Sequence, residues 1–257
     1  MSQSLPITPD LGARARLLDA AAEIFGTYNL EGATTRQLAE RAEVNQAAIP
    51  YYFGGKEGLY LATIEHFFSV HAPKIGSVVA EIESRLTAKN IDRGEALDLL
   101  KALLGTMLEV LLRQQTNRSF GRIIIREQMQ PTKAFDLIYE RVIRHVHQTI
   151  SALLAILLER EPDDRSVIFR AQMMVGQILV FLAGRETIRR RLNLAGYTDD
   201  EFAEIKAALH EQLDLLQPVG PASPFVRPSR ISDSAKAPSD KSEEKIEARS
   251  TKRGGRK

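Results

Sequence analysis

Small and polar side chains near residue 46 are of types that can contact DNA. A short helix is predicted here, and Ile49 and Phe53 share its inward side at helical spacing. Its outward side carries small and hydrogen-bonding residues: Gln46, Ala47, Pro50 and Tyr51. Such a surface suits a major groove when a second helix braces it. The same spacing also occurs in an ordinary helical hairpin, so both interpretations stay open.

Capping signals delimit the helices that would position these residues. Thr34 and Gln37 have the spacing of a capping box, which predicts the start of a helix. Asn45 is predicted to cap the second helix, which carries the outward side described above. The glycines at 54–55 interrupt the pattern, and a long helix is predicted to begin at Lys56.

Catalytic and metal-binding chemistry finds little support in the sequence. The absence of cysteine excludes disulfides, thiol nucleophiles and thiolate metal sites. His145 and His147 are two positions apart, so on a helix they would point roughly 200° apart. His66 and His71 also fall on different faces. We therefore expect no catalytic residue, no metal and no cofactor, and a protein that is not an enzyme.

The composition favours an all-helical protein with two structural units. The chain has 257 residues, of which 44% are apolar. Its first residues have neither the basic flank nor the apolar core of a signal peptide, and its contiguous apolar runs are far shorter than a membrane span. We therefore expect a cytoplasmic protein without membrane contact.

Charge is distributed unevenly along the chain. The net charge is +2, but the tail from Pro218 holds ten Lys/Arg and five Asp/Glu, which gives it +5 and leaves −3 for the first 217 residues. A slightly acidic body does not favour DNA binding. Basic residues must therefore gather at the DNA-facing side: Arg14, Arg16, Arg36, Arg41 and Lys56.

Helical periodicity and composition divide the chain into four segments. We expect a disordered arm at 1–12, a helix-turn-helix domain at 13–72, a helical ligand-binding and dimerisation domain at 73–217, and a disordered basic tail at 218–257. Pro73 predicts a kink or break at the boundary between the two helical domains. Beyond it, long helices are predicted at about 132–160, 163–192 and 199–217.

The last two predicted helices carry wide apolar stripes. The stripes at about 163–192 and 199–217 exceed what one face of a small bundle needs. They predict a homodimer, although burial within one subunit is the alternative. A two-fold dimer would also double the contacts that a short recognition helix makes over a palindrome.

The interior of the second domain is predicted to hold a ligand pocket. Such pockets are mainly apolar, with a few polar groups that fix the orientation of the ligand. The candidate polar residues are Arg126, Glu127, Gln128, Gln172, Gln177 and Arg185. For each of them, surface exposure or an internal ion pair is the alternative.

The first segment resembles the helix-turn-helix of the TetR family of bacterial transcriptional regulators, over about 14–67. The matching residues are Thr34-Thr35, Leu38-Ala39, Ala42, Val44, Ile49, Tyr52-Phe53 and the run from Gly55 to Leu59. The resemblance implies a dimeric repressor that binds a palindromic operator and is released by a small-molecule effector. It also implies the DNA-contacting residues: Thr34, Thr35, Arg36, Asn45, Gln46, Ala47, Ala48, Pro50, Tyr51, Tyr52 and Lys56.

Three residues depart from the family pattern. Glu43 stands at a turn position where the family often has glycine, Gln46 replaces a frequent lysine, and Pro50 replaces a frequent tyrosine. Pro50 lacks a backbone donor and a phosphate-contacting hydroxyl. We therefore expect much of the backbone contact to come from Thr35, Tyr51, Tyr52 and Lys56.

A second resemblance covers about 118–200. It rests on Arg126-Glu127-Gln128, Pro131-Thr132, Gly176-Gln177 and Gly184-Arg185-Glu186, which are similar to the C-terminal domain of the CecR-like subgroup of TetR regulators. This resemblance implies control of transport or drug-sensitivity genes.

Other functions stay open on the sequence alone. Within the same class, the protein could be an activator or a ligand-independent repressor. From another class, it could be a helical small-molecule-binding protein or an enzyme whose helix-turn-helix serves only as an interaction surface. The basic tail could also supply all of the DNA affinity.

Overall fold

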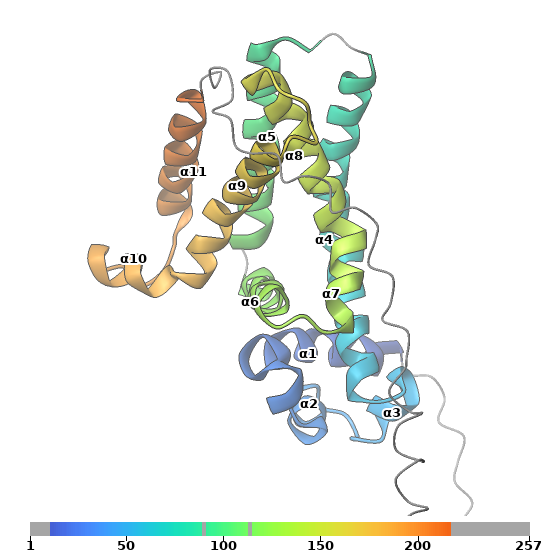
Figure 1. Ribbon diagram of the computed structural model, residues 1–257. Coiled ribbons are helices and arrows are strands. Elements are labelled where there is room, and N and C mark those ends of the chain that lie inside the picture. Colours follow the sequence, from blue (N-terminus) through green and yellow to red (C-terminus); the bar gives the residue numbers. More distant parts are fainter. Residues whose placement is uncertain (1–10, 89–90, 113–114, 217–257) are drawn as a thin grey trace, which may run out of the picture. The chain divides into compact units, whose positions relative to one another are not determined.

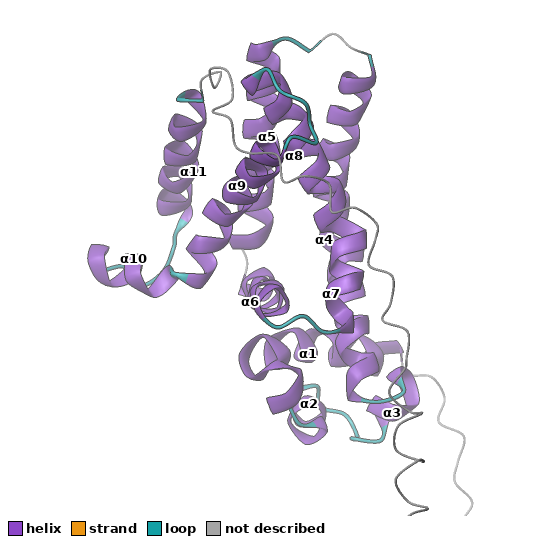
Figure 2. Cartoon of the chain, in the orientation of Figure 1, coloured by secondary structure: helices purple, strands orange, loops and turns teal. Residues whose placement is uncertain are grey.

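A computed structural model describes residues 11–88, 91–112 and 115–216, which form helices joined by short loops (Figures 1 and 2). No strand occurs in these ranges, so the predicted all-helical class is confirmed. The arm at 1–10 and the tail from 217 onward, with the properties predicted for them, lie outside the described residues. The helices of the N-terminal half are α1 (Leu11–Gly32), α2 (Thr35–Arg41), α3 (Ala48–Phe53), α4 (Lys56–Thr87) and α5 (Arg93–Leu112). Those that follow are α6 (Gln115–Met129), α7 (Lys133–Ile138), the π-helical segment η1 (Tyr139–Ile143), α8 (Arg144–Leu158), α9 (Arg165–Ala183), α10 (Arg185–Leu192) and α11 (Asp199–Asp214).

The helix-turn-helix lies in α2 and α3, and its first cap is as predicted. The Thr34 hydroxyl accepts a hydrogen bond from the Gln37 amide, and the Gln37 side chain accepts one from the Thr34 amide. Glu43, in the turn between the helices, has φ 54°. The turn therefore has the left-handed backbone that glycine favours, although a glutamate occupies the position.

The predicted cap of the second helix needs correction. The Asn45 side chain accepts a hydrogen bond from the Ala47 amide at 2.8 Å, so it closes a turn before the helix. The helix begins only at Ala48, and its N-cap is Ala47, which has no side-chain cap. Pro50 consequently lies in the first turn, where an amide has no partner within the helix to lose.

α4 connects the two parts of the molecule without interruption. It runs from Lys56 to Thr87 through Pro73, so the predicted break at this proline is wrong. Buried residues precede and follow the proline on the same helix, including Phe68 and Val79. Packing on both sides of Pro73 explains why one missing backbone hydrogen bond does not end the helix.

The buried residues form two hydrophobic clusters. The head cluster comprises most of the buried apolar residues between 17 and 68 together with Phe120, Ile123, Ala134 and Ile138. The body cluster comprises most of those of 79–112 and 146–178 together with Leu209 and Leu213. Because α6 and α7 contribute to the head cluster, the packing crosses the predicted boundary at residue 73, which remains a prediction.

The predicted long helices of the second half are interrupted. The helix expected at 132–160 begins after the Thr132 cap but contains the π-helical segment η1. The helix expected at 163–192 is divided at Gly184 into α9 and α10, because the backbone leaves the helical conformation there. α11 begins after a capping box formed by Thr198 and Glu201, and its predicted start is confirmed.

α9 is the most apolar of the exposed helices. By length and composition alone, α9 is long and apolar enough to cross a membrane, with a mean hydropathy of 1.6 over its apolar stretch. Only 22% of the residues in that stretch are buried in the structure. The short contiguous apolar runs in the sequence therefore underestimated the overall hydropathy of this helix. Its exposed large apolar residues are Ile168, Phe169, Met173 and Val180.

Candidate DNA-binding surface and ligand cavity

The residues predicted to read bases lie on the exposed side of α3 and of the turn before it. Gln46, Ala47 and Pro50 are exposed, and the Tyr51 side chain is 51% exposed. Ile49, on the opposite side, is fully buried in the head cluster. The inward and outward sides of the predicted helix are therefore as the spacing indicated. Ala48 and Tyr52 are half-buried at the edge of the exposed side.

Hydrogen bonds connect the two helices of this surface. The Gln46 amide donates to the Thr35 hydroxyl at 2.7 Å, which joins the start of α2 to the turn before α3. The rings of Tyr51 and Tyr52 lie edge to face, with centroids 4.8 Å apart. The first contact holds polar atoms of Thr35 and Gln46 next to each other, and the second holds the exposed Tyr51 ring against Tyr52.

The basic residues near this surface are held by nearby groups. Lys56 begins α4, and its amine donates to the carbonyls of Ala33 at 2.9 Å and Glu31 at 3.3 Å. The other contacts of the predicted basic set involve Arg36 with Glu40, Arg41 with Glu23, Arg16 with the carbonyl of Ala42, and Arg14 above the ring of Phe53. The cations are thus gathered around the helix-turn-helix, but intramolecular acceptors and carboxylates offset part of their charge.

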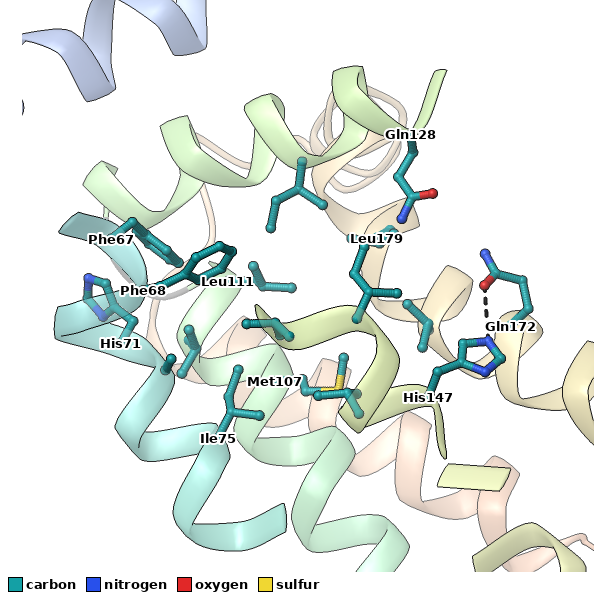
Figure 3. A pocket seen from close by; sticks show the side chains of 17 residues that line it. Phe67, Phe68, His71, Ile75, Met107, Leu111, Gln128, His147, Gln172 and Leu179 are labelled. Carbon is teal, nitrogen blue, oxygen red and sulfur yellow. Dashed lines mark hydrogen bonds between the residues drawn. The ribbon is translucent and has the colours of Figure 1, made fainter. Parts of the chain in front are cut away.

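A largely apolar cavity lies where α4, α5, α6, α8 and α9 meet (Figure 3). Its volume is about 80 Å³. One end is formed by Phe67, Phe68 and His71 of α4, and Met107 and Leu111 of α5 line its middle. The other end carries three polar side chains: Gln128 of α6, His147 of α8 and Gln172 of α9.

The polar end of this cavity adjoins a second, wider space. The His147 Nε2 and the Gln172 Oε1 are 3.2 Å apart, a hydrogen bond drawn in Figure 3. Gln128, Ile143, His147 and Gln172 border both the inner cavity and an outer groove of about 770 Å³. The two spaces are therefore adjacent, and the hydrogen-bonded His147–Gln172 pair borders both of them.

Ionic groups are scarce in the inner cavity. Among the described residues that line it, none is an arginine, lysine, aspartate or glutamate. Burial, and next the charge of His66, lower the pKa of His71 below its usual value, so this imidazole is neutral near pH 7. The cavity therefore offers apolar contact and hydrogen bonding instead of charge pairing.

The predicted ligand-binding residues are only partly brought together. Gln128 and Gln172 line the inner cavity, as predicted. Arg126, Glu127, Gln177 and Arg185 are not among the described residues that line it. Gln177 is half-buried on α9, and the Arg185 guanidinium lies 5.2 Å from the centre of the Tyr197 ring. The role of His147 was missed, because its position was tested only as a metal ligand.

Arg126 and its neighbours on α6 contact α1. The Arg126 guanidinium donates to the Phe25 carbonyl at 2.8 Å, and Arg122 donates to the Gly26 carbonyl at 3.0 Å. The backbones approach closely here, since a Cβ added to Gly26 would lie 2.7 Å from the Ser119 carbonyl oxygen. These contacts explain why Arg126 points away from the cavity.

Glu127 lies buried between α6 and α4. It is 2% exposed and accepts a hydrogen bond from the Tyr60 hydroxyl at 2.7 Å. The Thr132 amide donates to the same carboxylate at 2.9 Å, next to the cap of α7. Burial, followed by the hydrogen bond to Glu127, raises the pKa of Tyr60 above its usual value. Glu127 thus joins α4, α6 and the start of α7.

No group of three or more potential metal-ligating side chains occurs within the described part of the chain. His145 is exposed, whereas His147 pairs with Gln172. The geometry thus offers a DNA-facing surface at one end of α4 and a cavity beside the middle of the same helix.

Comparison with known proteins agrees with this geometry. Residues 17–63 match the family model described as bacterial regulatory proteins, tetR family. Residues 96–217 match the C-terminal domain of the HTH-type transcriptional dual regulator CecR. The CecR protein of Shigella flexneri is 31% identical over 204 residues, which cover 79% of this chain and 91% of that protein. A probable regulator of Bacillus subtilis, YttP, is 24% identical over 46% of this chain and 51% of its own length.

Solved structures share the fold at low sequence identity. The AibR structure, in complex with isovaleryl coenzyme A and operator DNA, has a TM-score of 0.58 at 13% identity and is covered completely, against 80% of this chain. A putative fatty acid metabolism regulator of Clostridium perfringens has a TM-score of 0.53 at 18% identity, with coverage of 97% of that chain and 76% of this one. Together with the two family matches and the CecR relative, these likenesses show that the chain belongs to the TetR family of DNA-binding transcriptional regulators, with a C-terminal domain of the CecR type.

Proposed function

We propose that the protein is a homodimeric repressor that binds a palindromic operator and is released from it by a small molecule in the inner cavity. Its relatives are transcriptional regulators, and we extend that role to this chain as a cytoplasmic protein without enzymatic activity. The DNA-contacting residues are those predicted on α2, α3 and the start of α4. Gln128 and Gln172, with His147, contact the effector.

One observation carries this proposal: three consecutive residues of α6 contact both the inner cavity and the helices of the DNA-binding head. Gln128 lines the cavity, whereas Glu127 and Arg126 hold Tyr60 of α4 and the Phe25 carbonyl of α1. A ligand that displaces Gln128 therefore moves the helix that holds the DNA-binding head. By linkage, the ligand weakens DNA binding only by its differential affinity for the two arrangements, on the order of 1–3 kcal/mol.

The exposed stripe of α9 supports the proposed dimer. Phe169, Met173 and Val180 are 55%, 66% and 55% exposed and recur at spacings of four and seven residues, which places them on one face. Gly176 lies on the same face, and a Cβ added there would meet no atom within 4 Å. A second α9 could approach closely at this glycine, and an exposed apolar stripe of this kind indicates an interface.

The structural neighbours support the combination of the two sites. The AibR structure holds an acyl-coenzyme A and operator DNA on the same fold. For the present chain we infer only that a ligand site and a DNA-binding site are likewise combined on one subunit. The residues that line its cavity are its own, so the ligand of AibR is not carried over. Control of transport or drug-sensitivity genes remains part of the proposal, on the resemblance to the CecR-like subgroup.

Selection of genomic fragments by the purified full-length protein tests the proposed function. We expect enrichment of a palindromic site, with an affinity that falls steeply as salt rises. Tyr51→Ala should weaken binding to that site at least tenfold, whereas Lys133→Ala, an exposed residue at the start of α7, should leave it unchanged. If the wild type and Tyr51→Ala bind the selected DNA site equally well, the assignment of the α3 surface to DNA contact is contradicted.

Truncation before Pro218 separates the head from the tail. If sequence-specific binding persists without residues 218–257, the tail adds at most nonspecific attraction. If it disappears, the tail supplies the affinity and the proposed surface is wrong. Turnover of a bound small molecule, with no DNA retention at low salt, would favour the rival enzyme.

Activation is the second candidate for the regulatory outcome. The Shigella flexneri relative is named a dual regulator, which favours keeping this alternative. Transcription measured in vitro from the selected promoter decides between the two: a fall on adding the protein means repression, and a rise means activation.

A further inference from the structure

The two adjoining spaces beside His147 indicate the chemical class of the effector, an inference that rests on the proposed function. The inner cavity is apolar and small, at about 80 Å³, whereas the outer groove, about 770 Å³ in volume, has a lining of mixed polar and apolar side chains. Ligand sites in proteins commonly measure roughly 300–1,000 Å³. The inner cavity therefore holds only part of a ligand, and the outer groove has room for the rest.

The polar part of the outer groove's lining consists of groups that form hydrogen bonds, beside apolar residues such as Phe135 and Ile168. Gln148 and Ser151 of α8 and Tyr139 of η1 offer donors and acceptors. Its charged residues are of opposite sign, Arg144 and Asp163, and the Arg144 guanidinium already pairs with Glu140. The described lining therefore favours a neutral polar group over a net charge.

The boundary between the two spaces can open without moving the backbone. Four residues line both spaces, and two of them, His147 and Gln172, share a hydrogen bond that is partly accessible to solvent. Rotation of these two side chains would join the spaces, and a polar atom of the ligand could replace the lost hydrogen bond. Figure 3 shows this pair at the end of the cavity opposite Phe67 and Phe68.

We propose that the effector is a neutral amphiphile whose polar group occupies the outer groove and whose short apolar end passes between His147 and Gln172 into the inner cavity. Acids, amines and purely polar molecules are disfavoured as ligands of the combined site.

Because the inner cavity is small, the apolar end of the ligand would push α4 and α6 apart. Phe67 and Phe68 of α4 line the cavity opposite Ile124 and Gln128 of α6. Phe67 also stacks on Phe120 of α6, with ring centroids 3.5 Å apart. Protein interiors are close-packed, so a group larger than the cavity displaces its walls. The displaced walls are the two helices that Glu127 and Tyr60 join.

A series of n-alkyl glucosides tests this proposal on the unaltered, DNA-free protein. The sugar is the neutral polar group, and the chain is lengthened from methyl to hexyl below micellar concentrations. We expect calorimetric affinity to rise by up to about fourfold for each added methylene and then level off as the inner cavity fills. An affinity independent of chain length, or binding of glucose as tight as that of hexyl glucoside, would overturn the proposal.

Methionine methyl resonances locate the apolar end. The chain has five methionines. Met107 lines the inner cavity, while Met129 and Met173 are 77% and 66% exposed. Hexyl glucoside should shift the Met107 methyl signal, assigned with Met107→Leu, and leave those of Met129 and Met173 in place. A shift confined to Met129 or Met173 would place the ligand elsewhere and overturn the proposal.

Two matched variants separate the spaces. Val175→Phe fills the inner cavity and should remove the dependence on chain length, whereas Val70→Phe, at an exposed position of α4, should preserve it. Gln148→Ala, which borders the outer groove, should weaken every glucoside by about fivefold alike. The chain-length series decides the outcome even if Val175→Phe does not fold.

Charge and DNA release provide the remaining readouts. If hexanoate or hexylammonium binds more tightly than hexyl glucoside, the proposal that the polar group of the effector is neutral is wrong. If hexyl glucoside shifts Met107 but leaves the protein on its selected operator, the ligand class stands and the proposed release mechanism fails. If it binds nowhere while the protein still binds and leaves its operator with another compound, the proposed function stands and the ligand class fails.

Discussion

The head cluster and the body cluster differ in how completely they are closed. The head cluster encloses aromatic residues such as Phe25 and Tyr60, whose ring centroids lie 4.9 Å apart, and α6 seals one side of it. The body cluster is rich in leucine and supplies Met107, Leu111 and Val146 to the inner cavity, to which the head cluster supplies Phe68; it also packs against α9, whose apolar stripe is exposed. A closed head keeps the DNA-facing residues in place, while an open body can accept a ligand and a second subunit. The four predictions below test this contrast.

Truncation of a core leucine should cost more in the head than at the cavity. Leu59 is fully buried in the head cluster, so Leu59→Ala should lower the free energy of unfolding by about 3–5 kcal/mol. Leu179 is half-buried and already adjoins the cavity, so Leu179→Ala should cost about 1–2 kcal/mol. Urea denaturation measures both values, and equal losses would contradict a difference in closure.

A charged residue introduced into the α9 stripe should weaken association of the two subunits. Met173→Asp places a carboxylate on each side of the proposed interface and should weaken the dimer at least about a hundredfold, equivalent to ~2.7 kcal/mol. Sedimentation equilibrium measures this change. Val70→Asp, at a position 56% exposed on α4, is the control and should keep the dimer intact. A dimer that survives Met173→Asp unchanged would place the interface elsewhere.

The buried pair of Tyr60 and Glu127 should give the head a dependence on alkaline pH. Because the pKa of Tyr60 is raised in the folded state, its contribution to stability is fully present below about pH 10 and is lost as pH rises further. Tyr60→Phe should lower the free energy of unfolding by about 1–3 kcal/mol at neutral pH and remove part of the alkaline loss.

Thermal and urea unfolding of the two proteins between pH 7 and 11 measure this difference. Tyr139→Phe, at a residue 39% exposed in η1, is the matched control and should match the wild type. Parallel pH curves for the wild type and Tyr60→Phe would show that the pair carries no such coupling.

The smallest expected effect concerns the turn of the helix-turn-helix. Glu43 has φ 54°, so Glu43→Gly should relieve backbone strain and raise the free energy of unfolding by about 0.5–1 kcal/mol. Glu40→Gly, three residues earlier in α2, should lower it by about 1 kcal/mol, because glycine disfavours a regular helix. Opposite signs for the two glutamates are the expected result of chemical denaturation.

Local signals explain why much of the fold could be predicted. The capping boxes at Thr34 and Thr198 depend on side chains only three residues apart, and the outward side of α3 depends on helical spacing. The family resemblance was confirmed over both parts of the chain. The break at Pro73 was wrong because buried neighbours on each side outweigh a local preference.

The candidate site was only half predictable. Polarity alone selected Gln128 and Gln172, which line the cavity, but it also selected Arg126 and Glu127, which contact the head. His147 was passed over because its partner Gln172 lies 25 residues away. No spacing rule connects residues that meet only when separate helices pack.

The sequence by itself determined the all-helical class, the capping boxes at Thr34 and Thr198 and the outward side of α3, because backbone hydrogen bonding and helical period are local properties. Only the tertiary structure decided that Glu127 meets Tyr60, 67 positions away, and that a small apolar cavity adjoins a wider groove of mixed lining at His147. It also decided which apolar helix keeps an exposed stripe. These features depend on which faces of distant helices pack together, because burial is a property of the assembled helices and not of any one segment.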